Sequence, residues 1–110
     1  MKSRFVQEGN TLDYINTTAK AINAGDIVVF GSRVGVAATD IPIGSTGTVK
    51  MNGVFEVLKD DKEITVGAKL HYDQENEVMT ATSNDNTIEA GYAASAATAI
   101  STTVYIKFLG

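Results

Sequence analysis

His71 is the only histidine in the chain, so any serine–histidine–aspartate site would have to use it as the base. Such a site also needs an acid that orients the base. Because His71 alternates with Leu70 and Tyr72, a strand would turn its side chain toward solvent. The chain has no cysteine, which excludes thiolate nucleophiles, thiolate metal ligands and disulfides. We therefore predict that the protein has no catalytic residue and is not an enzyme.

Acidic residues gather in two short polar segments. Asp73, Glu75 and Glu77 could offer oxygen ligands to calcium, but the glycine and the terminal glutamate of a calcium-binding loop are missing at the required spacing. The second segment, residues 59–63, mixes three carboxylates with two lysines. Both patterns are typical of solvated turns, and we predict no metal site and no cofactor.

Residues 44–50, GSTGTVK, resemble a phosphate-binding loop only superficially. The lysine does not directly follow the second glycine, and no Ser or Thr follows the lysine. The segment also runs into an expected strand, whereas phosphate binding relies on the N-terminus of a helix. A plain glycine turn is the favoured interpretation.

Charge and hydropathy narrow the class of protein further. The net charge is −4 and the isoelectric point is about 4.8, which argues against binding nucleic acid through phosphate neutralisation. No apolar run approaches a membrane-spanning length and no signal-peptide pattern opens the chain. We expect a soluble protein made without export that binds neither membrane nor a small-molecule substrate, so its function is to bind another macromolecule.

The elements that position these residues are short strands. We predict an all-β fold, a small β-barrel or β-tulip-like domain, in which one or two short helices are allowed. Residues 1–18 are expected to form an extended arm that pairs either with the domain's own sheet or with the edge of another molecule. Residues 19–110 are expected to form a single β-rich domain. The predicted strands are residues 27–30, 34–38, 46–58, 70–72, 78–82, 88–94 and 103–108, of which 70–72 and 78–82 form a hairpin.

Two segments allow a helix. Residues 17–23 could form one helical turn, and residues 93–100, AASAATAI, could form either a loop or a short helix.

Asn52-Gly53 poses a choice of topology. Asn-Gly between apolar runs is a strong signal for a two-residue hairpin turn, but such a turn would set apolar residues opposite charged ones on one face. Period-two alternation continues across the pair, which favours one long strand over residues 46–58. Gly53 would then lie on the apolar face, where a close backbone or subunit neighbour is expected.

The chain also shows weak internal similarity. A shift of 42 residues aligns Gly25 with Gly67, and it also pairs Val28 with Leu70, Phe30 with Tyr72 and Val36 with Val78. A second, differently spaced similarity relates residues 35–37 and 48–49 to residues 91–93 and 103–104. Recurring strand–loop units of an all-β barrel would produce both patterns.

Read in order, these segments resemble the small capsid cement, or decoration, proteins of tailed phages. The similar segments are residues 6–10 (VQEGN), 12–14 (LDY), 24–29 (AGDIVV), 34–41, 47–49, 53–57 (GVFEV), 67–70 and 91–93. Members of this family have also been described as domains of unknown function or as recombinases of the RecA/RadA type. The recombinase description finds no support here, because the chain lacks a nucleotide-binding loop and is too short for an ATPase core.

The resemblance implies a function and a location. It implies a homotrimer on the outer surface of the virion capsid, at or near three-fold positions, made in the host cytoplasm and binding subunits of the major capsid protein. The layout is similar to the head-stabilising protein of lambda-like phages, whose N-terminal arm reaches onto the shell. Carried over by residue, Phe5, Val6, Gln7 and Leu12 match that arm and could add a strand to a capsid edge.

Two other classes of function remain open from the residues. An accessory enzyme or recombinase-related protein would use His71 and the acidic turn, and would show nucleotide or metal binding that His71→Ala abolishes. A host-surface or carbohydrate adhesion module is the third possibility. The chain has four Tyr, four Phe and no Trp, so it offers few aromatic platforms for sugars, and this class ranks below the cement protein.

Overall fold

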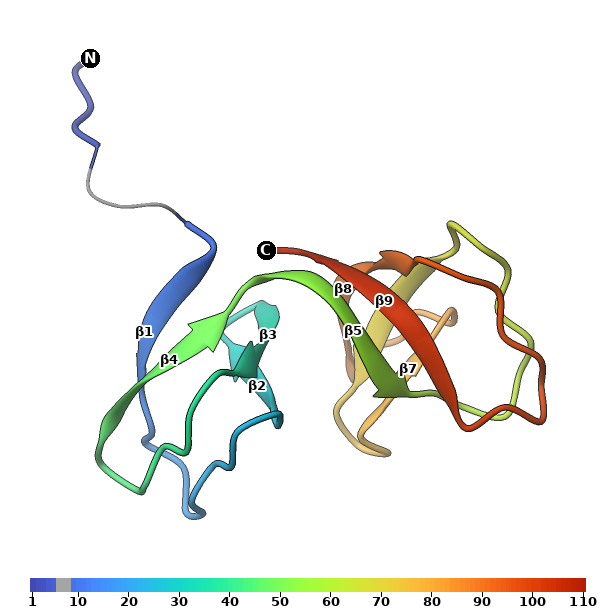
Figure 1. Ribbon diagram of the computed structural model, residues 1–110, viewed down its shortest axis with the longest axis horizontal. Coiled ribbons are helices and arrows are strands. Elements are labelled where there is room, and N and C mark those ends of the chain that lie inside the picture. The colour runs from blue at the N-terminus through green and yellow to red at the C-terminus, as the bar shows by residue number, and fades with distance from the viewer. Residues whose placement is uncertain (6–8) are drawn as a thin grey trace.

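The computed structural model describes residues 1–5 and 9–110, which form nine strands and no helix (Figure 1). The predicted all-β class is confirmed, and the helical turn expected at residues 17–23 is wrong. Of residues 93–100, Ala93 ends a strand and residues 94–100 form a loop. The strands are β1 (Thr11–Ile15), β2 (Ile27–Phe30), β3 (Arg33–Ala37), β4 (Thr46–Lys50), β5 (Asn52–Leu58), β6 (Lys69–Asp73), β7 (Val78–Thr80), β8 (Thr87–Ala93) and β9 (Thr103–Leu109).

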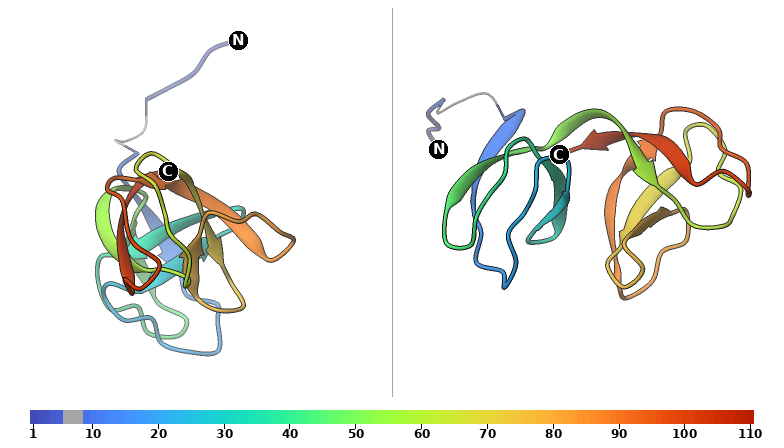
Figure 2. Two further views of the ribbon diagram at one scale, coloured as in Figure 1. Left: turned by 90° about the vertical axis from the view of Figure 1, so that its right-hand side faces the viewer. Right: turned by 60° about the horizontal axis from the view of Figure 1, so that its bottom comes forward.

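The strands form two antiparallel sheets. The first sheet has the order β1-β4-β3-β2 and the second has the order β5-β9-β8-β6-β7. Figure 2 shows the two sheets as neighbouring lobes, joined where the chain passes from β4 into β5. We call β1–β4 the first unit and β5–β9 the second unit.

The two units repeat one topology. Without β7, the second order is β5-β9-β8-β6, which matches β1-β4-β3-β2 strand for strand. The same backbone hydrogen bonds close the same loops. The Gly25 amide donates to the Ala37 carbonyl at 2.8 Å, and the Gly67 amide donates to the Ala93 carbonyl at 2.8 Å. The weak internal similarity in the sequence therefore reflects a structural repeat.

Further contacts repeat at equivalent places. The isolated bridge between Ile22 and Ile41 in the first unit corresponds to the bridge between Ile64 and Ala97 in the second. These bridges tie the loop before the second strand of each unit to the loop before its last strand. The irregular segments of both units are thus held by the same main-chain contacts.

The inserted hairpin explains where the sequence alignment fails. The hairpin of β6 and β7 was predicted correctly, although β7 ends at Thr80 and not at residue 82. In this hairpin Tyr72 lies opposite Met79. It has no counterpart in the first unit, so a uniform shift of 42 residues breaks down beyond β6. The structural counterpart of Val36 is Tyr92, because these residues pair with Lys50 and Lys107 respectively; the match of Val36 to Val78 is wrong.

The segment 46–58 crosses from one sheet to the other. As predicted, Asn52-Gly53 does not form a hairpin turn. The prediction of a single long strand is wrong, because the ladder breaks at Met51. β4 pairs with β1 and β3, whereas β5 pairs with β9. The apolar alternation persists through the break, since Val49 and Met51 pack in one cluster and Phe55 packs against the other.

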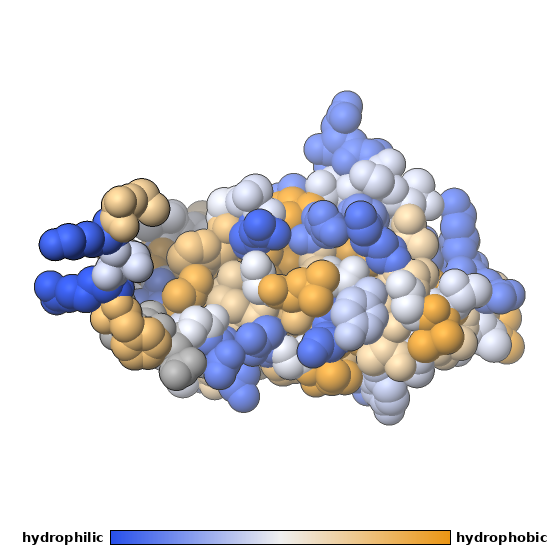
Figure 3. All heavy atoms as spheres, turned by 90° about the horizontal axis from the view of Figure 1, so that it is seen from above, coloured by the Kyte–Doolittle hydropathy of each residue, from blue (hydrophilic) through white to orange (hydrophobic). Residues whose placement is uncertain are grey.

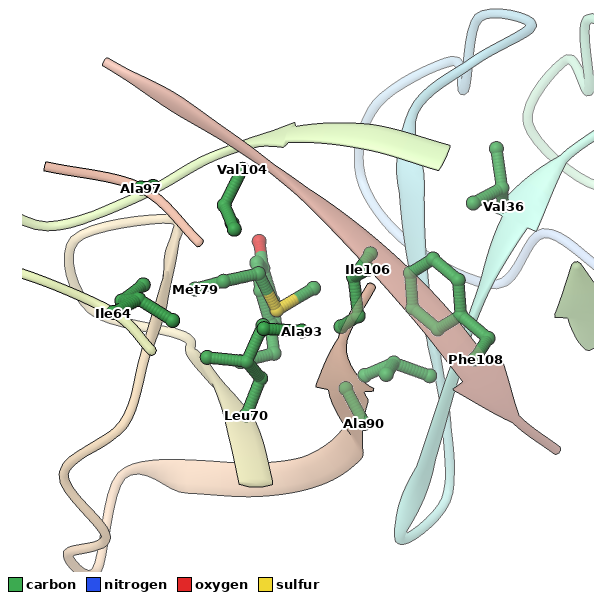
Figure 4. Packing of buried hydrophobic residues seen from close by; sticks show 12 residues of the cluster. Val36, Ile64, Leu70, Met79, Ala90, Ala93, Ala97, Val104, Ile106 and Phe108 are labelled. Carbon is green, nitrogen blue, oxygen red and sulfur yellow. The ribbon is translucent and has the colours of Figure 1, made fainter. Parts of the chain in front are cut away.

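Two hydrophobic clusters hold the molecule together. The smaller cluster fills the first unit around Ile41 and Val49. The larger one fills the second unit around Phe108 and also takes in Val34 and Val36 of β3, which lies against β8. Figure 4 shows Val36 reaching toward Phe108 from the neighbouring unit. Because one cluster spans both units, burial of apolar area couples their stability.

The second sheet approaches a barrel without closing. A parallel bridge joins Lys59 to Met79, and the Asp60 amide donates to the Met79 carbonyl at 3.1 Å, which draws the ends of edge strands β5 and β7 together. The structure contains no closed barrel among the described residues, so the barrel expectation is corrected to two open sheets. The reason is that the strands divide into a four-stranded sheet and a five-stranded sheet instead of one continuous ladder.

Two glycines, Gly35 and Gly91, lie where the backbone of a neighbouring strand comes very close. The sequence had instead suggested such a contact at Gly53. A Cβ atom at Gly35 would lie 2.6 Å from the Lys50 carbonyl oxygen, and one at the equivalent Gly91 would overlap the Lys107 carbonyl oxygen. Gly53 is exposed, and within the described chain a Cβ there would meet only the Phe55 ring, at 3.3 Å. Within the described chain, Gly53 therefore lacks the close backbone neighbour that was expected. Its φ of 117° is a conformation that favours glycine, which explains why a glycine occupies this position.

Candidate functional site

His71 lies on β6, half-buried, between Thr80 of β7 and Glu89 of β8. Glu89 forms an ion pair with Lys69, with 3.6 Å between Nζ and Oε1, on an exposed part of the sheet. Within residues 1–5 and 9–110, no group of three or more His, Asp or Glu side chains is arranged to hold a metal ion. The neighbours of His71 are thus the cross-strand neighbours that any residue in the middle of a sheet has.

The acidic hairpin tip is a network of local hydrogen bonds. Asp73 Oδ1 accepts hydrogen bonds from the amides of Glu75 at 3.0 Å and Asn76 at 3.2 Å, and its Oδ2 accepts one from Asn76 Nδ2 at 2.9 Å. The bond from the Asn76 side chain, followed by the backbone bonds, lowers the pKa of Asp73 below its usual value. The carboxylate thus shapes the turn between β6 and β7.

Asp60 has a similar structural role in the second acidic segment. Its Oδ1 accepts a hydrogen bond from the Lys62 amide at 3.2 Å, and its Oδ2 accepts one from the Thr80 hydroxyl at 2.7 Å. The carboxylate therefore links the loop after β5 to β7. Asp61 and Glu63 are exposed.

The turn before β4 is a glycine turn, as predicted. Gly44 has a φ of 80°, and its amide donates to the Asn16 carbonyl at 2.8 Å, while the Ser45 amide donates to the Pro42 carbonyl. The chain then enters β4 directly. The helix on which phosphate-binding loops rely does not follow this turn.

An open groove lies between β5 and β7, beside the start of β2. It has a volume of about 420 Å³, and the residues that line it include Asp26, Glu56, Glu77 and Tyr72. Burial raises the pKa of Tyr72, and the negative charges of Glu77, Asp73 and Asp26 raise it further. The groove is an acidic surface hollow, whose charge favours a cationic over an anionic occupant.

The predicted arm divides into two parts. Residues 1–5 form no strand and extend from the body of the molecule (Figure 1), and Phe5 has 78% of its surface exposed. Thr11–Ile15, also expected in the arm, form β1 and pair with β4 of the domain's own sheet. Leu12 lies opposite Val49 and packs against the smaller cluster. Val6 and Gln7 lie outside the described residues.

A surface feature that the sequence analysis missed is the outer face of β5 and β9. Val54 and Leu58 of β5 and Tyr105 and Leu109 of β9 are large exposed side chains on this face. A signal was present, because alternation places Val54 among the polar residues of its strand face and leaves Tyr105 off the apolar face of β9. In figure 3, the view from above shows orange apolar groups interspersed with blue hydrophilic ones.

The fold and these surfaces define an all-β protein with unpaired strand edges at β1 and β5, an exposed N-terminal segment and an exposed apolar face. The model of one family, the phage cement proteins, matches residues 6–108. The chain therefore belongs to the phage cement protein family, whose role is to stabilise the phage capsid. No curated protein and no solved structure matches the chain. The described residues contain no helix, and hence none that could cross a membrane.

Proposed function

We propose that the protein decorates the capsid of a tailed phage and stabilises it by binding major capsid subunits on the outer surface. It acts as a homotrimer at or near three-fold positions and is made in the host cytoplasm. The observation that carries this proposal is the family match, which covers residues 6–108, nearly the whole chain. The proposal gives the protein no catalytic residue and no cofactor, and assigns it neither nucleic acid, membrane nor small-molecule substrate as partner.

The N-terminal segment is the proposed capsid contact. The ladder between β1 and β4 already begins at Asn10, whose carbonyl accepts a hydrogen bond from the Met51 amide at 2.9 Å. The segment before it therefore leaves the sheet from a fixed point. Phe5 offers an exposed aromatic side chain, and Val6 and Gln7 belong to the same proposed contact.

Strand addition at β1 would extend this contact. β1 is an edge strand, so one row of its backbone groups is free to pair with a capsid strand. Leu12 would contribute through its backbone, because its side chain packs in the protein's own core. Each added backbone hydrogen bond is worth about 0.5–1.5 kcal/mol net, and many copies on a closed shell multiply weak contacts by avidity.

Deletion of residues 1–9 tests the arm. The truncation leaves Asn10 and its bond to Met51 in place, so circular dichroism and thermal unfolding should show an intact fold. Co-sedimentation with expanded capsids should be lost. Undiminished sedimentation of the folded truncated protein would contradict the proposed role of the arm.

A point substitution refines the test. Phe5→Ser should weaken capsid binding, whereas Ile43→Ser, at a similarly exposed apolar residue in the loop before β4, should leave it unchanged. Equal losses for the two variants would indicate a nonspecific effect of surface hydrophobicity instead of an arm contact.

A further inference from the structure

The outer face of β5 and β9 is the most apolar exposed strand face of the second unit. Val54, Leu58, Tyr105 and Leu109 have 60%, 59%, 50% and 59% of their surfaces exposed. They alternate along their strands with residues packed in the larger cluster, such as Phe55 and Ile106, so all four lie on the side away from it. We call these four residues the β5–β9 face.

The register of the two strands makes this face continuous. Tyr105 lies directly opposite Glu56, between Val54 and Leu58 on the neighbouring strand. Diagonal neighbours on adjacent strands are about 7–8 Å apart, within reach of aromatic side chains. The apolar residues therefore form one patch across both strands, instead of isolated exposed side chains of the kind that any surface carries.

The first unit shows that the fold does not require this patch. By the repeated topology, Val54 corresponds to Thr11, Glu56 to Asp13 and Tyr105 to Thr48. The same strand face is thus mostly polar in the first unit. Only Leu58 has an apolar counterpart, Ile15, which has 58% of its surface exposed.

The charges on the face indicate what kind of partner it fits. Glu56 and Lys107 lie on the same side as the four apolar residues, Glu56 opposite Tyr105 and Lys107 opposite Val54. Glu56 accepts a hydrogen bond from the Thr103 hydroxyl at 3.2 Å, and the one ion pair of the described residues joins Lys69 and Glu89 instead. Beside its apolar centre the face therefore carries an acid and a base that form no ion pair within the described part of the chain.

A surface of this composition is complementary to itself. Near a rotation axis the same residues of each copy meet, so apolar side chains cluster at the axis while the acid of one copy can face the base of another. Within the chain, β3 already covers β8 of the other unit and buries Val34 and Val36 there. Association of sheets from the two related units is thus already part of this structure.

We propose that the β5–β9 face is the contact through which copies of this chain associate. This inference rests on the proposed function only in that it locates the interface of the proposed oligomer. The tyrosine and the leucines supply the large apolar contacts expected at the centre of an interface, and the free edge of β5 lies beside them.

Light scattering of the purified full-length chain tests the proposal without capsids. The wild-type protein should have a mass of at least twice the 11.6 kDa of one chain. Leu58→Glu should shift the mass to that of the monomer, with at least a hundredfold rise in the concentration needed for association. Ile15→Glu is the matched control, because Ile15 occupies the equivalent strand position with equal exposure, and it should leave the mass unchanged.

A second variant keeps the test decisive if Leu58→Glu does not fold. Tyr105→Thr installs the residue type of the equivalent first-unit position and should also weaken association while thermal unfolding shows an intact fold. A monomeric wild-type protein, or folded Leu58→Glu and Tyr105→Thr variants that keep the wild-type mass, would overturn the proposal. Monomers that bind capsids would overturn this inference alone, whereas oligomers that do not bind capsids would overturn only the proposed capsid function.

Discussion

The two units share the same arrangement of strands, but at one equivalent position they carry buried polar side chains of different chemistry. Asn16 follows β1 and Lys59 follows β5, and the amides of both donate to the loop that precedes the last strand, at Ser45 and Thr102. Both side chains are buried, yet one is a neutral amide and the other a cation. Both units therefore place a buried polar side chain at the same position to hold a loop, but this side chain can be an amide or an ammonium group.

The two side chains satisfy the same need in different ways. Asn16 Nδ2 donates to the carbonyls of Lys20 at 2.8 Å and Ile41 at 2.9 Å. Lys59 Nζ donates to the carbonyls of Asp60 at 2.8 Å, Thr98 at 3.0 Å and Ser101 at 3.2 Å. Irregular loops cannot satisfy their carbonyls within a ladder, so each unit provides a buried donor instead.

The largest effect should come from the glycines at the repeated strand crossing. Gly91→Ala would force the new methyl group into the Lys107 carbonyl, and we expect a loss of about 3 kcal/mol or more in the free energy of unfolding. Gly35→Ala should lose less, because the Lys50 carbonyl lies 2.6 Å from the position of the added Cβ. Urea unfolding measures both.

The same experiment tests whether the units form a single domain. Gly9→Ala is the control, since a Cβ there meets nothing within 4 Å, and it should change stability by less than about 1 kcal/mol. Because the larger cluster includes Val34 and Val36, we expect one cooperative transition in every variant. Two transitions, with only one shifted by each glycine substitution, would show that the units unfold independently.

A smaller effect should follow from removing either buried donor. Lys59→Met keeps an apolar stem but leaves the Thr98 and Ser101 carbonyls without their partner, which should cost about 2 kcal/mol. Asn16→Ala should cost a similar amount in the first unit. Lys69→Met, which removes an exposed ion pair, should cost less than about 1 kcal/mol. A tolerated Lys59→Met would show that water replaces the ammonium group.

Local patterns were sufficient to predict most of the strands. Residues 27–30 form β2 as expected, because an uninterrupted apolar run bounded by turn residues has few alternatives to a strand covered on both faces. The turn between β6 and β7 was predictable from its polar residues. The change of sheet at Met51 was not, because alternation continues across it and only long-range packing decides which cluster each side chain enters.

The candidate surfaces were predictable only in part. The exposed Phe5 fits the expected arm, but the pairing of β1 with β4 joins residues as far apart in the sequence as Thr11 and Lys50, and the local sequence does not specify that partner. The β5–β9 face became visible only when the register aligned Val54 and Leu58 with Tyr105. The buried role of Lys59 had no signal, because a lysine in an acidic polar segment ordinarily indicates a solvated turn.

The smallest expected effect concerns Gly53, where the second unit departs from the first. Its counterpart by position is Asn10, because Gly53 pairs with Phe108 and the Met51 amide donates to Asn10. Only Gly53 of this pair has a positive φ, 117°, as the chain crosses between sheets. A side chain there is strained, so Gly53→Ala should cost about 1–2 kcal/mol in urea unfolding.

Gly53→Val separates backbone strain from a close neighbour. If strain is the cause, Val should cost little more than Ala, because the nearest group, the Phe55 ring, is the end of a side chain that can shift. If a second copy approaches Gly53, which directly precedes Val54 of the β5–β9 face, Val should cost far more than Ala, and the difference should grow with protein concentration. Unfolding of both variants at two concentrations thus decides whether the glycine serves the crossing between the units or the contact between copies.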